Sequence, residues 1–104
     1  MSDSSSNRRY AAARHVLSSP TIALRTRRYT ADGRVDWYRL LADRPTMSSG
    51  EQVLVDIARR LWEGQALPDA WELTRRLDAG NARRVLEAVD YLDDAEQPAF
   101  AAAA

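Results

Sequence analysis

A chain of 104 residues with 45% hydrophobic residues and three tryptophans is long enough for one small domain and too apolar to be disordered throughout. Cysteine and lysine are absent, since all 15 basic residues are arginine, and this excludes disulfides, thiol catalysis and lysine Schiff bases. The net charge is zero, but residues 1–44 carry nine arginines and four acids, whereas residues 45–104 carry six arginines and eleven acids. The two halves can therefore attract each other, or the basic half can meet an anionic partner.

The two ends of the chain contain little that could build a core. Residues 1–19 begin Met-Ser-Asp-Ser-Ser-Ser-Asn, and we expect a disordered or partly helical arm there, with one helical turn over residues 11–17. Near the other end Pro98 blocks a simple helical continuation, and residues 97–104 are expected to form a flexible tail. The predicted domain therefore spans residues 20–96.

Residues 21–36 carry the pattern of a short β-hairpin. Ile22 and Leu24 alternate with small or basic residues, and Asp32-Gly33 is a strong signal for a two-residue hairpin turn. Because an isolated hairpin is marginal in water, its apolar face should pack on helices.

Two helices are predicted from their capping residues. Asp36 is placed to cap a short helix over residues 37–43. Ser48 and Glu51 have the spacing of a capping box, in which each side chain accepts a hydrogen bond from the other residue's backbone. They begin a predicted amphipathic helix over residues 49–63.

Two further helices complete the predicted fold. One is expected over residues 68–78 with Pro68 in its first turn, and Gly80 separates it from a helix over residues 82–94 that Asn81 caps. The apolar stripes of the three longer helices have one economical arrangement, which is to face each other. We therefore predict a mainly α fold, with a minor β part, in which a three-helix unit over residues 47–94 follows the hairpin and the short helix and disordered tails flank the domain.

Basic and aromatic residues gather on the predicted hairpin and at the start of the short helix, and we expect an interface there. Such a group can contact a protein, bind single-stranded nucleic acid, protect a sheet edge from pairing, or dock on the acidic half of its own chain. The residues are Arg25, Arg27, Arg28, Tyr29, Arg34, Trp37 and Tyr38.

The last two predicted helices allow a helix-turn-helix alternative. A turn over residues 78–81 would place Arg83 and Arg84 where base contacts arise. Against this, Glu87 and Asp90 follow on the same helix and would repel phosphates. The structural interpretation is that the two arginines pair with Glu87 on a solvated face.

No group of residues has a recognisable catalytic or metal-binding spacing. His15 is the only histidine and stands in the expected arm without an evident partner. Trp62 and Trp71 are interpreted as core anchors. We therefore expect no enzyme activity, no cofactor and no metal.

Three short segments suggest an origin. They are Ser19-Pro20-Thr21-Ile22, Val35-Asp36-Trp37, and Met47-Ser-Ser-Gly-Glu51 with the Leu61-Trp62 that follows it. Through them the stretch from Val16 to Leu92 resembles small uncharacterised helical proteins of high-GC actinobacteria and their phages. The resemblance implies an origin and not an activity, and it assigns no functional residue.

These observations favour a non-enzymatic protein-interaction module, an adaptor or assembly component, with a protein partner or as a homo-oligomer. A small helix-turn-helix-like DNA-binding regulator is the first alternative, and a phage structural or assembly protein is the second. No apolar run approaches the roughly 20 residues of a membrane span, and the first residues lack the apolar stretch of a secretory signal. We therefore expect a cytoplasmic protein without a membrane partner.

Overall fold

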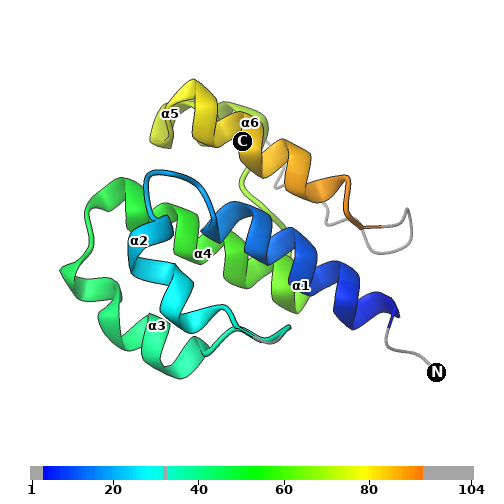
Figure 1. The fold of residues 1–104 in the computed structure, drawn as a ribbon. Helices are drawn as coiled ribbons and strands as arrows, with labels where there is room; N and C mark the ends of the chain where they lie inside the picture. The colour runs from blue at the N-terminus through cyan, green and yellow to red at the C-terminus, as the bar shows by residue number, and fades with distance from the viewer. Residues whose placement is uncertain (1–3, 32, 93–104) are drawn as a thin grey trace.

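The computed structural model describes residues 4–31 and 33–92, and over these ranges every regular element is helical (Figure 1). The prediction of a mainly α fold is confirmed, whereas the minor β part is not seen in this part of the chain. In chain order the elements are α1 (Ser4–Leu17), α2 (Ala23–Thr26), the 3-10 helix η1 (Arg27–Tyr29), α3 (Trp37–Asp43), the 3-10 helix η2 (Arg44–Thr46), α4 (Ser49–Glu63), α5 (Ala70–Arg76) and α6 (Ala79–Val89).

Helix α1 lies at the centre of the packing. Ala12 and Ala13 are fully buried, as are Val16 and Leu17 one turn later. The helix packs most extensively on α4 and next on α6, and the two alanines allow these helices to approach closely (Figure 1). The expectation that residues 1–19 form an arm with little part in the core is therefore corrected for the described residues 4–19, while residues 1–3 lie outside them.

Helix α4 has the bounds that its capping pattern predicts. The Ser48 hydroxyl accepts a hydrogen bond from the Glu51 backbone N–H at 3.2 Å, and the Glu51 carboxylate accepts one from the Ser48 backbone N–H at 2.8 Å. Gly64 ends the helix with a φ of 72°, the left-handed conformation that glycine adopts without strain. A Cβ at Gly64 would lie 3.1 Å from Nη2 of Arg9, so this cation covers the negative end of the α4 dipole.

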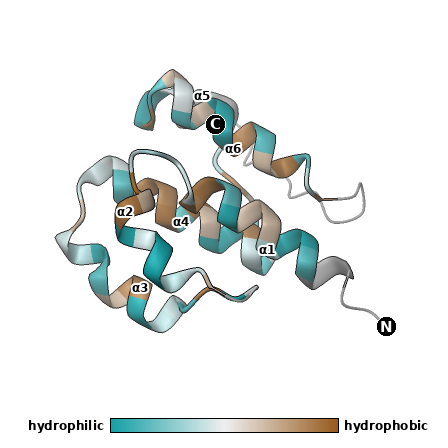
Figure 2. Ribbon diagram, in the orientation of Figure 1, coloured by the Kyte–Doolittle hydropathy of each residue, from teal (hydrophilic) through white to brown (hydrophobic). Residues whose placement is uncertain are grey.

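The apolar stripes of α4 and α6 face α1 more than they face each other. Figure 2 shows hydrophobic residues concentrated where α1, α4 and α6 meet, and α4 has few direct contacts with α5 or α6. The predicted three-helix unit over residues 47–94 is thus corrected, because α1 supplies the surface that joins its helices. The buried residues of α4 and α6 are Leu54, Val55, Ile57, Ala58, Leu61, Asn81, Ala82, Val85, Ala88 and Val89.

The predicted β-hairpin is replaced by α2, η1 and a loop. Ile22 and Thr26 are both buried, which is the i,i+4 spacing of a helix, whereas Leu24, which a strand would bury beside Ile22, is 74% exposed. The chain does reverse near the expected turn, since the Arg34 N–H donates to the Ala31 carbonyl at 3.0 Å and Gly33 has a φ of 72°. No ladder of strand hydrogen bonds follows from this turn in the described residues.

The short helix α3 has its predicted bounds, and Asp36 caps it by accepting a hydrogen bond from the Arg39 N–H at 3.2 Å. Helix α3 is followed by η2, and Arg44 in η2 makes a two-bonded pair with Asp56 of α4, with N–O distances of 2.8 and 2.7 Å. The hydrogen bonds that Arg44 donates to Asp56 raise the pKa of the Arg44 guanidinium above its ordinary value, so this link keeps its charge.

Helices α5 and α6 begin at aspartates that the sequence interpretation passed over. Asp69 accepts a hydrogen bond from the Glu72 N–H and Asp78 accepts one from the Asn81 N–H, each at 2.8 Å. The predicted start at Pro68 and the predicted cap at Asn81 are therefore wrong. Because the turn between the helices needs only residues 77 and 78, Gly80 lies inside the first turn of α6. The predicted end of the last helix at residue 94 and the tail over residues 97–104 lie outside the described residues.

The α5 face also differs from the prediction. Leu73 and Leu77 are buried, whereas Trp71, expected as a core anchor, is 67% exposed. Trp62 does pack on the core, where its ring contacts Tyr10 with the centroids 6.5 Å apart.

Among residues 4–31 and 33–92, no helix combines the length and the apolar character that crossing a membrane requires.

Candidate interaction surface

The structure divides the seven predicted interface residues into an inward group and an outward group. Arg25, Tyr29 and Trp37 are partly buried and packed on the body of the domain. The outward group is formed by exposed side chains of η1, of the loop that follows it, and of the first turn of α3. We call this group the loop surface, and its members are Arg27, Arg28, Arg34 and Tyr38.

Arg25 holds α2 to the segment that begins α4. Its guanidinium donates to the Thr46 hydroxyl at 2.9 Å and to the Thr46 carbonyl at 3.3 Å, and it lies 3.4 Å from the Asp43 carboxylate and 3.5 Å from that of Glu51. Because every one of these partners belongs to the same chain, the guanidinium is already used within the fold. Arg25 is therefore removed from the candidate interface.

Trp37 anchors α3 on α4. Its ring centroid lies 6.2 Å from that of Trp62. The Arg59 guanidinium lies 5.0 Å from the centroid of the Trp37 ring, which is a cation–π contact. The indole Nε1 is buried and has no hydrogen-bond partner in the described part of the chain. The Trp37 side chain therefore stabilises the packing of α3 on α4, and its buried Nε1 is not accessible to a binding partner.

Tyr38, one residue later, points away from the core. It is 87% exposed, and Leu41, on the next turn of α3, is also exposed. An aromatic ring left in water loses the stabilisation that burial gives, and tyrosine is enriched among the residues that dominate binding energies. The adjacent residues Trp37 and Tyr38 therefore divide their roles between the core and the surface.

The three outward arginines carry charge that the fold does not neutralise. Over residues 4–31 and 33–92, no carboxylate forms an ion pair with Arg27, Arg28 or Arg34. Arg28 lies 5.9 Å from the centroid of the Tyr29 ring, which orients its stem without removing its charge. Some arginines of the basic half do pair with acids of the acidic half, as Arg44 does with Asp56. Internal ion pairing therefore explains the position of Arg44 but not that of the three outward arginines.

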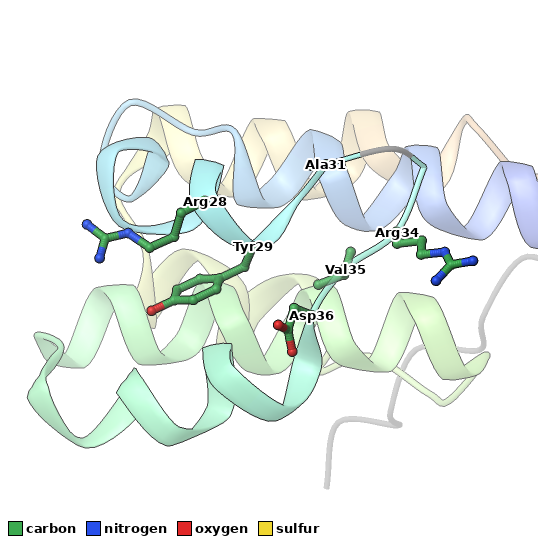
Figure 3. A pocket seen from close by; sticks show the side chains of 6 residues that line it. All are labelled: Arg28, Tyr29, Ala31, Arg34, Val35 and Asp36. Atoms are coloured by element: carbon green, nitrogen blue, oxygen red, sulfur yellow. The ribbon is translucent and has the colours of Figure 1, made fainter.

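A shallow hollow of about 370 Å³ lies between η1 and α3 (Figure 3). The guanidinium groups of Arg28 and Arg34 extend from its rim in opposite directions, and the Asp36 carboxylate stands between them (Figure 3). Two cations that diverge around a carboxylate do not form a closed binding site for a small anion. The arrangement instead presents separate positive charges to a broad partner. Its lining residues are Arg28, Tyr29, Ala31, Arg34, Val35 and Asp36.

The predicted DNA-contacting residues of α6 also separate. Arg83 is exposed, whereas Arg84 donates to the His15 carbonyl at 3.0 Å and to the Ser18 hydroxyl at 3.3 Å. Arg84 thereby covers the carbonyl end of α1, where a cation is favoured by the helix dipole. The structural interpretation that both arginines pair with Glu87 is wrong, because Glu87 pairs with His15 instead.

His15 has partners that the sequence did not reveal. Its Nε2 lies 3.0 Å from the Glu87 carboxylate, and its ring centroid lies 5.3 Å from that of Tyr91. These contacts join α1 to the C-terminal side of α6.

In the part of the chain that the structure describes, no group of three or more histidine, aspartate or glutamate residues is placed to hold a metal ion.

A polar cluster joins the turn between α1 and α2 to α6, and the sequence did not predict it; Ser19 and Asn81 are buried and Thr21 is exposed. Asn81 accepts a hydrogen bond from the buried Ser19 hydroxyl through Oδ1, and its amide nitrogen donates to the Thr21 hydroxyl at 2.9 Å. The only local signal was the Ser19-Pro20-Thr21 turn, and nothing near it in the sequence identified residue 81 as its partner. Because all three polar side chains are satisfied by each other, the cluster fixes the α1–α2 turn on α6.

The chain was compared with protein-family models, with curated proteins and with solved structures, and none of the three comparisons found a match. The geometry of the loop surface is therefore the basis on which a function is proposed.

Proposed function

We propose that this protein is a non-enzymatic interaction module that binds an acidic protein partner through the loop surface. The proposal is carried by the 87% exposure of Tyr38 on α3, which contacts η1, together with three exposed arginines of η1 and the following loop that have no acidic partner among the described residues. Tyrosine and arginine are enriched at binding hot spots, and lysine, glutamate and aspartate are depleted there.

The rigidity of the surface supports this proposal. Tyr38 stands on a helix that Asp36 caps and that Trp37 anchors to α4, so its backbone is already ordered before a partner arrives. A tyrosine side chain has few rotatable bonds, and it therefore loses little conformational entropy on binding. Leu41 extends the apolar part of the contact along α3.

The charges of the loop surface support an acidic partner. Three positive charges that no carboxylate among residues 4–31 and 33–92 pairs with favour association with a negatively charged surface and raise the association rate at low ionic strength. Because Arg28 and Arg34 diverge, their carboxylate partners must lie well apart, as they do on a protein surface.

A DNA-binding regulator is the competing proposal, and its exposed contact residues are Arg83 on α6 and the arginines of the loop surface. It requires α6 to approach phosphates with Glu87 on the helix and Asp90 immediately after it, both of them exposed. An assembly protein of a phage is a special case of the interaction module, and the identity of the captured partner distinguishes the two.

Replacing Tyr38 by alanine is expected to lower partner capture by about tenfold or more, which corresponds to ~1.4 kcal/mol of binding free energy. The full chain is immobilised, extract of the source cells is passed over it, and captured proteins are quantified by mass spectrometry. The matched control is Trp71→Ala, which removes an exposed aromatic residue from α5 and should leave capture unchanged. Circular dichroism establishes that both variants are folded.

Equal capture by wild type and Tyr38→Ala would contradict the proposed surface. Capture that disappears on nuclease treatment and on replacing Arg83 by alanine would instead establish the DNA-binding alternative.

A further inference from the structure

Thr30 follows Arg27, Arg28 and Tyr29, so two arginines stand three and two residues before a hydroxyl side chain. This is the charge pattern that basophilic protein kinases select, since their peptide-binding clefts place carboxylates opposite these two positions. Among all serines and threonines of the chain, Thr30 alone has arginines at both positions. We propose that Thr30 is the phosphorylation site of a basophilic serine/threonine kinase.

The Thr30 hydroxyl is only weakly held by the fold. It donates to the Thr26 carbonyl at 3.3 Å and to the Arg27 carbonyl at 3.5 Å, both at the long end of the hydrogen-bond range. Thr26 is a contrast within the same segment, because its hydroxyl donates to the Leu17 carbonyl at 2.6 Å and its side chain is buried. Thr30 is half-buried, and its hydroxyl is released from the fold more easily than that of Thr26, which has a structural role.

The backbone at Thr30 and just after it is held by few contacts. Thr30 ends the three-residue helix η1, and its own N–H reaches the Arg27 carbonyl at a long 3.4 Å. Ala31, Gly33 and Arg34 are all exposed, and Val35 is the first buried residue on the C-terminal side. Drawing the loop into a kinase cleft breaks the hydrogen bond from the Asp36 N–H to the Tyr29 carbonyl at 2.7 Å and moves Tyr29, which packs on the core. Segments with few buried contacts and exposed hydrogen bonds are those that open locally.

The reaction is an ordinary phosphoryl transfer with ATP as co-substrate. The Thr30 oxygen forms a bond to the γ-phosphorus while the bond from that phosphorus to the β–γ bridging oxygen breaks. ADP leaves with the electron pair, and the hydroxyl proton passes to the catalytic aspartate of the kinase.

The product changes the charge of the loop surface. A phosphothreonine carries about −1.5 to −2 charges at pH 7 and accepts hydrogen bonds from arginine. It would stand beside Arg27, Arg28 and Arg34, the cations that have no carboxylate partner in the described chain. Phosphorylation should therefore weaken binding of an acidic partner, and this consequence rests on the proposed function.

The modification is tested on the folded full chain with ATP and the purified catalytic domain of a basophilic kinase. Peptide mass spectrometry is expected to find one phosphoryl group, on Thr30. Thr30→Val should abolish it, and Arg28→Ala should slow its addition about tenfold or more. The matched control is Thr74→Val, which removes an exposed threonine whose hydroxyl also bonds a carbonyl three residues earlier but which lacks the arginines. No phosphoryl group on Thr30, or an undiminished rate for Arg28→Ala, overturns the site.

The consequence is tested separately, by titrating the captured partner with unmodified and phosphorylated protein. We expect phosphorylation to weaken binding about tenfold or more and Thr30→Val to bind as the wild type does. Equal affinity of the two forms would overturn the regulatory role and leave the site intact. If capture finds no partner, the proposed function fails, and the mass spectra still decide whether Thr30 is modified.

Discussion

Replacing Leu17 by alanine is expected to lower the free energy of unfolding by about 2–5 kcal/mol. Leu17 is fully buried at the end of α1, and its carbonyl also accepts the hydrogen bond from the Thr26 hydroxyl. The truncation leaves a cavity in the core and removes apolar contacts of α1. Because small domains are stable by only about 5–15 kcal/mol, the loss is a large part of the total.

The control for this prediction is Arg14→Ala on the same helix. Arg14 is exposed, and its replacement should change stability by no more than about 0.5 kcal/mol. Urea unfolding followed by tryptophan fluorescence measures both variants. If Leu17→Ala had the wild-type midpoint and slope, α1 would not belong to the core.

Replacing Asn81 by alanine is expected to cost roughly 2–3 kcal/mol, since buried polar groups that lose their partner are costly. The substitution leaves the hydroxyl of the fully buried Ser19 without an acceptor, and it removes the amide that donates a hydrogen bond to Thr21. The α1–α2 turn would lose its attachment to α6 at the same time.

A double-mutant cycle with Ser19→Ala tests whether these two side chains act together. Ser19→Ala removes the hydroxyl that Asn81→Ala leaves without an acceptor, so the double variant should be more stable than the sum of the single losses predicts. Strictly additive losses in chemical unfolding would show that the two side chains do not interact.

The elements that the sequence predicted correctly are those with local signals. Asp36 marks α3 and the Ser48–Glu51 capping box marks α4, because a cap and the backbone groups that it satisfies lie within three residues. In the hairpin region Ile22 and Leu24 fit the alternation of a strand, while Ile22 and Thr26 fit a helical turn. Tertiary contact with α1 decided between the two patterns, and that contact is not visible in the local sequence.

Helix α1 was underestimated because its buried face contains two alanines. Ala12 and Ala13 contribute little hydrophobicity, and the segment around them is rich in arginine and serine. Small side chains matter here through the close helix approach that they allow, which becomes apparent only when the neighbouring helices are in place.

The candidate surface was predicted in part. Local pattern identified the arginines and the Trp37-Tyr38 pair, and one member of that pair is indeed exposed. It did not separate Arg25 from its neighbours, because the carboxylates that bind Arg25 belong to Asp43 and Glu51, far along the chain. The same limit applies to Arg84, whose acceptors lie on α1.

The most direct test of the proposed binding surface is site-specific photo-cross-linking in the complex with the captured partner. A benzophenone side chain is placed at residue 38 in one protein and at residue 71 in another, and the cross-linked species are identified by mass spectrometry. Residue 38 is expected to cross-link to an acidic segment of the partner, and residue 71 is expected to give no cross-link. Cross-linking from residue 71 with none from residue 38 would contradict the loop surface as the binding site and place the interface on α5.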